Sequence, residues 1–95
     1  MAVGMLVQLP GGTADFYDSV MDHLEWDTRE KPKGMVSHYA GSTPGGWLVF
    51  DIWESQADWE RFMAERLGSA LAAAAGGQAP KVEPTFVQIH REEHA

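Results

Sequence analysis

The chain has 95 residues, no cysteine, and a formal net charge of −7 from seven basic and fourteen acidic side chains, so it predicts one small domain that can bury only about 60 to 65% of its unfolded surface. The acidic balance argues against nucleic acid or anionic lipid as partners, and the lack of cysteine excludes disulfides, thiolate metal sites and a cysteine nucleophile. Because no basic leader precedes the N-terminal apolar residues, and no apolar stretch approaches about eighteen residues, we expect a cytoplasmic protein.

The first strand and the first helix have separate signals. Residues 3–9 alternate in polarity until residues 10–12, Pro-Gly-Gly, end the predicted strand. Thr13 is typical of a helix N-cap, and an apolar side chain at every fourth position from 16 to 24 predicts an amphipathic helix of about three turns. The charged, proline-bearing segment 27–33 ends it.

A hairpin follows. Residues 35–40 are a predicted strand, and the turn formers in residues 41–46 send the chain back into a third strand. This third strand is apolar on both faces, with Trp47, Val49 and Trp53 on one face, which Asp51 interrupts, and Leu48, Phe50 and Ile52 on the other. Helices of the same chain account for one apolar face of an antiparallel sheet, so a second subunit is the expected cover for the other.

The second half repeats the order of helix and strand. Ser55 and Asp58 are a capping-box signature for a helix over residues 57–71, which ends at a C-cap near Gly76 and Gly77. Alternation over residues 82–90 predicts the fourth strand.

The predicted order βαββαβ defines the fold class. It is that of an α+β, ferredoxin-like domain over residues 1–95, with a four-stranded antiparallel sheet and two helices on one face. Residues 91–95 are expected to be a frayed polar tail. Because apolar residues remain on the uncovered face, we expect a homodimer in which two sheets pair face to face.

Residues 53–62, WESQADWERF, resemble the antibiotic biosynthesis monooxygenase-like group of the dimeric α/β-barrel superfamily. In that group a strand ending in Trp-Glu-Ser runs into an aromatic-bearing helix, and the order of elements is similar from residue 1 to about residue 90. The resemblance implies a homodimer whose sheets form a barrel, with a small-molecule cavity between sheet and helices in each subunit.

Two activities of this superfamily depend on residues that the chain lacks. Cofactor-independent quinone-forming monooxygenases use an Asn, with Trp and Tyr nearby, and this sequence contains no Asn. Haem-degrading members use an Asn on the first strand and a Trp and a haem-ligating His on the second helix, where an ungapped comparison places Gly4, Phe62 and Ala72. Neither mechanism can be transferred, and no bound cofactor is expected.

His38 and Asp51 are the candidate catalytic residues. An imidazole in the middle of a short strand can act as a general acid or base near neutral pH, or can be a satisfied structural group. A carboxylate among apolar neighbours needs a partner, either as a structural ion pair or to orient an imidazole. If paired residue numbers in the hairpin have an odd sum, such as 87, His38 lies across from Val49 and diagonal to Asp51, whereas an even sum separates their faces. We favour the odd sum.

Aromatic side chains could line a cavity for an aromatic ligand or could simply fill the core. His23 borders the apolar stripe of the first helix and could point into the cavity or into solvent. Gln8 would be a polar cavity group if its face of the first strand looks at the helices. The candidate substrate-binding residues are Gln8, Tyr17, His23, Trp53, Trp59, Phe62 and Phe86.

Three functions compete. The first is a small enzyme that acts, without a cofactor, as an oxygenase, cyclase or isomerase on an aromatic or polyketide-like molecule. The second is a non-catalytic module that binds a hydrophobic ligand or supplies a dimer interface. The third, an RNA-recognition domain, needs basic residues beside exposed aromatics, and the net charge opposes it. His90 and His94 have a helical ligand spacing but lie in a predicted strand end and tail, so no metal site is predicted.

Overall fold

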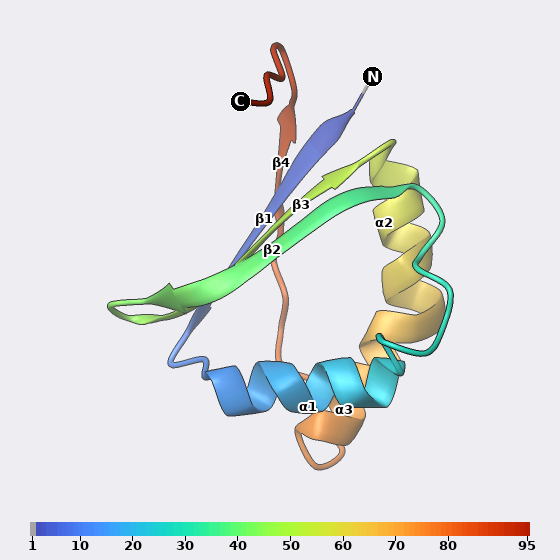
Figure 1. The fold of residues 1–95 in the computed structure, drawn as a ribbon. Helices are drawn as coiled ribbons and strands as arrows, with labels where there is room; N and C mark the ends of the chain where they lie inside the picture. The colour runs from blue at the N-terminus through green and yellow to red at the C-terminus, as the bar shows by residue number, and fades with distance from the viewer. Residues whose placement is uncertain (1) are drawn as a thin grey trace.

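Residues 2–95 are described by the computed structural model, in which a twisted sheet carries its helices on one face (Figure 1). The elements are β1 (Val3–Pro10), α1 (Ala14–Leu24), β2 (Met35–Thr43), β3 (Gly46–Trp53), α2 (Gln56–Phe62), the π-helical turn η1 (Met63–Leu67), α3 (Gly68–Ala74) and β4 (Thr85–Gln88). The strand order is β2-β3-β1-β4, and all neighbours are antiparallel. This confirms the ferredoxin-like fold. Residue 1 of the predicted domain lies outside the described residues.

The ends of α1 are fixed by local hydrogen bonds. At its start the hydroxyl of Thr13 accepts from the backbone N–H of Phe16 at 3.1 Å, as the sequence predicts. At its end Glu25 adopts a left-handed conformation with φ of 54°, and the N–H groups of Glu25 and Trp26 donate back to the carbonyls of Asp22 and Met21. This Schellman-type ending satisfies the last carbonyls of the helix and reverses the chain at Trp26.

The second helical segment is less regular than predicted. Its start is the predicted cap, because the Ser55 hydroxyl accepts from the Asp58 N–H at 3.1 Å. The predicted single helix is instead three consecutive pieces, with η1 between α2 and α3. The wider turn changes the phase of the helix, and nothing in the residue types of Met63–Leu67 distinguishes it from an α-helix. Gly76 and Gly77, with positive φ, follow the end of α3.

The β2–β3 hairpin is longer and tighter than predicted. Both strands run to a two-residue turn at residues 44–45, whereas the sequence predicts a six-residue connection. Paired numbers sum to 89 over most of the hairpin, so the odd sum is confirmed and the value 87 is wrong. His38 therefore lies directly opposite Asp51. The register shifts between Met35 and Ser37, where a bulge ends the regular pairing.

β4 is shorter than the predicted strand over residues 82–90. It covers only Thr85–Gln88 and pairs with the first half of β1. Pro84 directly precedes it and has no N–H to donate to a ladder, which explains the late start. Residues 91–95 are exposed and have no regular secondary structure.

The sheet has a covered face and an open face. The covered face contains Met5, Val7, Asp51 and Trp53, which are buried beneath the helices. The open face contains Leu48, Phe50 and Ile52 of β3, together with the residues that pair directly with them on β1, Gln8, Leu6 and Gly4. No helix within residues 2–95 is long and apolar enough to cross a membrane.

Candidate functional site

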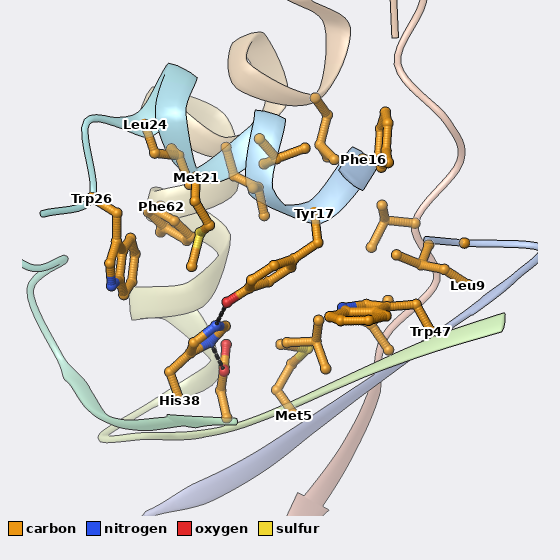
Figure 2. A pocket seen from close by; sticks show the side chains of 18 of the residues that line it. Met5, Leu9, Phe16, Tyr17, Met21, Leu24, Trp26, His38, Trp47 and Phe62 are labelled. Atoms are coloured by element: carbon orange, nitrogen blue, oxygen red, sulfur yellow. Dashed lines mark hydrogen bonds and ion pairs between the residues drawn. The ribbon is translucent and has the colours of Figure 1, made fainter. Parts of the chain in front are cut away.

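An apolar pocket lies between the covered face and the helices, with a cavity volume of about 90 Å³. Its walls come from β1, α1, β2, β3 and the α2–α3 segment, and most of them are aliphatic, methionine or aromatic side chains. The hydroxyl, imidazole and carboxyl groups in the lining belong to Thr13, Tyr17, His38 and Asp51. Figure 2 shows Tyr17 reaching from α1 across the pocket toward His38 on β2.

Four side chains form one hydrogen-bonded chain at this place. The Tyr17 Oη and His38 Nε2 atoms are 2.5 Å apart, and His38 Nδ1 lies 2.6 Å from Asp51 Oδ1. The other carboxylate oxygen, Oδ2, accepts from the indole Nε1–H of Trp53 at 3.2 Å. The planes of the Tyr17 and His38 rings differ by 8°. Asp51 is 3% exposed and Trp53 is 0% exposed, so the inner end of the chain is closed from solvent.

The backbone accounts for this convergence. The hairpin register sets His38 directly across from Asp51, and opposed residues of antiparallel strands share a face. Trp53 follows Asp51 by two positions on the same strand and therefore shares its face as well. Tyr17 lies in the second turn of α1, beside the part of the sheet that holds His38.

The hydrogen bonds indicate where the protons lie. An ionised carboxylate can only accept, and Asp51 already receives the N–H of Trp53, so its second oxygen accepts from a protonated Nδ1 of His38. In the neutral imidazole Nε2 then carries the lone pair and accepts the Tyr17 hydroxyl. Burial, followed by the negative charges of Asp51 and Asp18, raises the pKa of Tyr17 to about 12. Tyr17 is therefore a neutral phenol at physiological pH.

Two tryptophans that sequence reasoning did not place in the site surround this chain. Trp47 packs against Tyr17 with ring centroids 5.3 Å apart, and Trp26 lies 5.4 Å from the His38 ring. Trp47 shares the two-residue phase of Val49 and Asp51, which could have identified it. Trp26 depends on the left-handed turn at Glu25, which is unusual for a residue other than glycine or asparagine.

The predicted site residues separate into two groups. His38, Asp51, Tyr17, Trp59 and Phe62 line the pocket. The remaining four do not. Trp53 lies beneath the pocket and reaches Asp51, Phe86 on β4 packs edge to face on Trp59, His23 is exposed, and Gln8 lies on the open face.

The positions of Gln8 and His23 therefore correct the expectation that they could be cavity groups. Gln8 fails because even-numbered positions of β1 point away from the helices, as its pairing with Leu48 shows. It instead lines a separate shallow hollow on the open face with Leu6 and Lys81. His23 is exposed and does not line the pocket, because it lies at the border of the apolar stripe of α1, where the orientation of the helix about its axis decides whether a side chain faces the sheet or the solvent.

The C-terminal histidines are apart from the pocket. His90 and His94 are both exposed, and His94 Nε2 lies 2.7 Å from Glu92 Oε2. Within the part of the chain that the structure describes, no three histidine, cysteine, aspartate or glutamate side chains are grouped so that they could hold a metal ion.

The sequence itself matches no protein-family model and no curated protein. The fold, however, is similar to several solved structures. A protein of unknown function from Nitrosomonas europaea is 19% identical with a TM-score of 0.68, and the similarity covers 99% of this chain and 94% of that one. A monooxygenase from Streptomyces coelicolor, solved with the ligand nanaomycin D, is 17% identical with a TM-score of 0.63. The similarity covers 99% of this chain and 91% of that one.

A third similar structure is the cofactor-independent oxygenase SnoaB from Streptomyces nogalater. It is 14% identical, its TM-score is 0.58, and the similarity covers 96% of this chain and 92% of that one. At these identities the similarity establishes a shared fold over nearly the whole chain, which is the fold that residues 53–62 predict.

Proposed function

We propose that this chain, whose fold is that of the antibiotic biosynthesis monooxygenase-like proteins, is an enzyme that binds an apolar small molecule and moves a proton on it. The chain of hydrogen bonds through Tyr17, His38 and Asp51 is the observation that carries this proposal. A core at this position could be filled by apolar side chains without the cost of burying a carboxylate. A buried and fully partnered acid–base chain that ends in an apolar pocket is instead typical of a catalytic site.

The phenol of Tyr17 is the end of this chain that a ligand would meet. A proton leaving the ligand passes to Tyr17 Oη while the phenol proton passes to His38 Nε2, and the Asp51 carboxylate balances the imidazolium that forms. Because the pKa of Tyr17 is raised to about 12, a free tyrosinate is disfavoured, and the two transfers are expected to be concerted. Return of the proton to another atom gives isomerisation. Attack of the carbanion on a second carbonyl carbon of the ligand, whose oxygen takes up the proton, gives cyclisation. Addition of the carbanion to dioxygen, followed by return of the proton, gives a hydroperoxide.

The ligand that fits these walls is flat and apolar. The rings of Trp26, Trp47 and Phe62 offer faces and edges for stacking, which suits an aromatic or polyketide-like molecule. The cavity of about 90 Å³ is smaller than the roughly 150 Å³ that accommodates one benzene ring. Ligand entry therefore needs a side chain to move. We expect this to be Trp26, which lies beyond the last turn of α1 rather than within an element.

A homodimer completes the proposal. Leu48, Phe50 and Ile52 remain half-exposed on the open face, and no element within residues 2–95 covers them. Tyr39, which pairs with Phe50, and Val87, which pairs with Gly4, are exposed at 58% and 47%. A second copy of the sheet is a self-complementary cover for this apolar surface.

Proton exchange on a ring ketone tests the catalytic proposal directly. In heavy water the enzyme should accelerate replacement of the hydrogens beside the carbonyl of 1-tetralone, followed by proton NMR. His38→Ala should slow this exchange by about 10²-fold or more. His23→Ala, which removes an exposed imidazole of α1, is the matched control and should not change the rate. Binding of 1-tetralone without faster exchange would instead support the alternative function, a non-catalytic binding module.

A further inference from the structure

Trp47 has an indole N–H group that the protein does not use. Its Nε1 atom is buried and has no hydrogen-bond partner among residues 2–95. Burying an unpartnered donor costs free energy that a phenylalanine of similar shape would avoid, so such a group needs a reason. Two nitrogens of Arg66 share this state, but that guanidinium donates its Nη1–H to the Glu30 carbonyl and lies outside the pocket lining.

A second tryptophan on the same strand provides an internal comparison. Trp53 shares the covered face with Trp47, and its Nε1–H donates to Asp51 Oδ2 at 3.2 Å. The fold therefore satisfies one indole N–H of β3 from within and leaves the other unsatisfied. The unsatisfied one belongs to the tryptophan that lines the pocket.

Trp47 packs against Tyr17, so its N–H lies near the end of the hydrogen-bonded chain that a ligand would meet. The Trp47 and Tyr17 rings are in contact, with centroids 5.3 Å apart and planes inclined by 35°. In Figure 2 the nitrogen-bearing edge of Trp47 is turned toward α1 and Tyr17. One small ring bound beside both side chains could therefore meet the phenol of Tyr17 and the N–H of Trp47 at neighbouring atoms.

We infer that Trp47 is a catalytic residue that donates its Nε1–H to a carbonyl oxygen of the substrate, which assigns the substrate to the enolisable ring ketones. An indole N–H can only donate, so its partner must be an acceptor such as a carbonyl oxygen. Loss of the proton from the carbon beside that carbonyl leaves an electron pair that delocalises onto the oxygen. The C–H bond breaks, the proton moves to Tyr17 Oη as the phenol proton moves to His38 Nε2, and the N–H of Trp47 stabilises the enolate oxygen.

This assignment rests on the proton-transfer function proposed above. Because Nε1 is buried, a ligand can reach it only if the pocket also opens beside Trp47, on the other side of Tyr17 from Trp26 (Figure 2). A donor in a pocket with few polar atoms is worth more to a developing negative charge than the same donor in water.

The test compares Trp47→Phe with the intact protein on two probes of one shape, 1-tetralone and its hydrocarbon analogue tetralin. Ligand-observed NMR titration gives the affinities, and deuterium incorporation into 1-tetralone gives the exchange rate. We expect the variant to lose about 10²-fold in exchange rate and up to roughly tenfold in affinity for 1-tetralone. Its affinity for tetralin should be unchanged, because the ring that packs on the hydrocarbon is retained.

The outcomes separate the two proposals. If the intact protein exchanges 1-tetralone and Trp47→Phe exchanges it equally fast, the role of Trp47 is overturned and the Tyr17–His38–Asp51 function remains. An equal loss of affinity for both probes would reduce Trp47 to a packing residue, with the same consequence. If the intact protein accelerates no exchange, the proposed function fails and the inference fails with it.

Discussion

The covered face and the open face of β3 differ in whether the side chains on them find partners within the same chain. On the covered face, both polar atoms of the Asp51 carboxylate and the N–H of Trp53 find partners within the fold. On the open face, Leu48, Phe50 and Ile52 remain half-exposed, and the nearby ring pair of Phe50 and Tyr39 lies on the outside of the chain. The candidate chemistry is therefore assembled inside one subunit, whereas the remaining apolar surface is the part that the proposed homodimer would cover. Changes on the two faces should have separable effects.

The largest effect is expected on the open face. Phe50→Lys places a charge at the centre of the proposed sheet-to-sheet interface, and burying an unpaired ammonium is too costly to be tolerated there. Analytical ultracentrifugation should show a monomer or aggregate in place of a dimer. Leu48→Lys should behave in the same way, whereas Glu54→Lys, an exposed position just beyond β3, should remain dimeric. Intact dimers for both Phe50→Lys and Leu48→Lys would contradict the interface.

On the covered face, Asp51→Ala should lower the stability of the subunit itself. The substitution leaves the N–H groups of Trp53 and His38 without their acceptor inside the fold. Removing one partner of such a buried group costs about 3 kcal/mol in the free energy of unfolding, measured in urea, and should also abolish proton exchange. Asp22→Asn, an exposed change on α1, is the control. A loss below about 1 kcal/mol would show that the carboxylate is readily replaced.

The faces themselves could be predicted from the sequence, because strand periodicity fixes which residues share a face. The odd sum of paired residues follows from the same parity, and it is enough to bring His38 and Asp51 together. The value of that sum depends on the turn. A two-residue connection at residues 44–45 extends both strands and changes a diagonal contact into a direct one.

Features that do not follow from the alternation of side chains along a strand could not be predicted from the sequence. Whether His23 points inward depends on a rotation of α1 of a few tens of degrees, which a pattern of apolar residues does not resolve. Trp26 reaches the site because the backbone of Glu25 adopts a left-handed conformation, although the sequence has no glycine there to indicate such a turn. The hydrogen bond from Trp53 to Asp51 could have been predicted, because residues two apart on a strand share a face and an indole N–H is a hydrogen-bond donor.

The two tyrosines allow the faces to be compared with one small change. Tyr17→Phe removes the hydroxyl at the end of the hydrogen-bonded chain on the covered face. Proton exchange on 1-tetralone should therefore slow by about 10²-fold or more. The loss of its hydrogen bond should cost only about 1 kcal/mol of stability. Tyr39→Phe removes a hydroxyl from an exposed ring that is stacked on Phe50 and should leave the exchange rate unchanged. Equal rates for the two variants would remove Tyr17 from the mechanism.

The smallest expected effect is on titration. In a Tyr39→Phe background Tyr17 is the sole tyrosine, and its phenolate absorbance should appear with a midpoint near the raised pKa of about 12. Adding Asp51→Asn removes a negative charge that raises this pKa, so the midpoint should move toward 10.0, the ordinary pKa of a tyrosine. A midpoint that Asp51→Asn leaves unchanged would mean that burial and Asp18, without Asp51, raise the pKa of Tyr17.

The same shift has a consequence for stability. The folded pKa of Tyr17 lies above the unfolded value, so its contribution to stability is complete below pH 10.0 and is lost as the pH rises toward about 12. Solvent reaches part of the ring, which makes this contribution smaller than the shift alone implies. The difference in the free energy of unfolding between Tyr39→Phe and the double variant Tyr17→Phe/Tyr39→Phe should therefore shrink over this interval. A difference that stays constant with pH would show that the phenol of Tyr17 is hydrated like an exposed one, and that the covered face is open to water at the point where its proton chain begins.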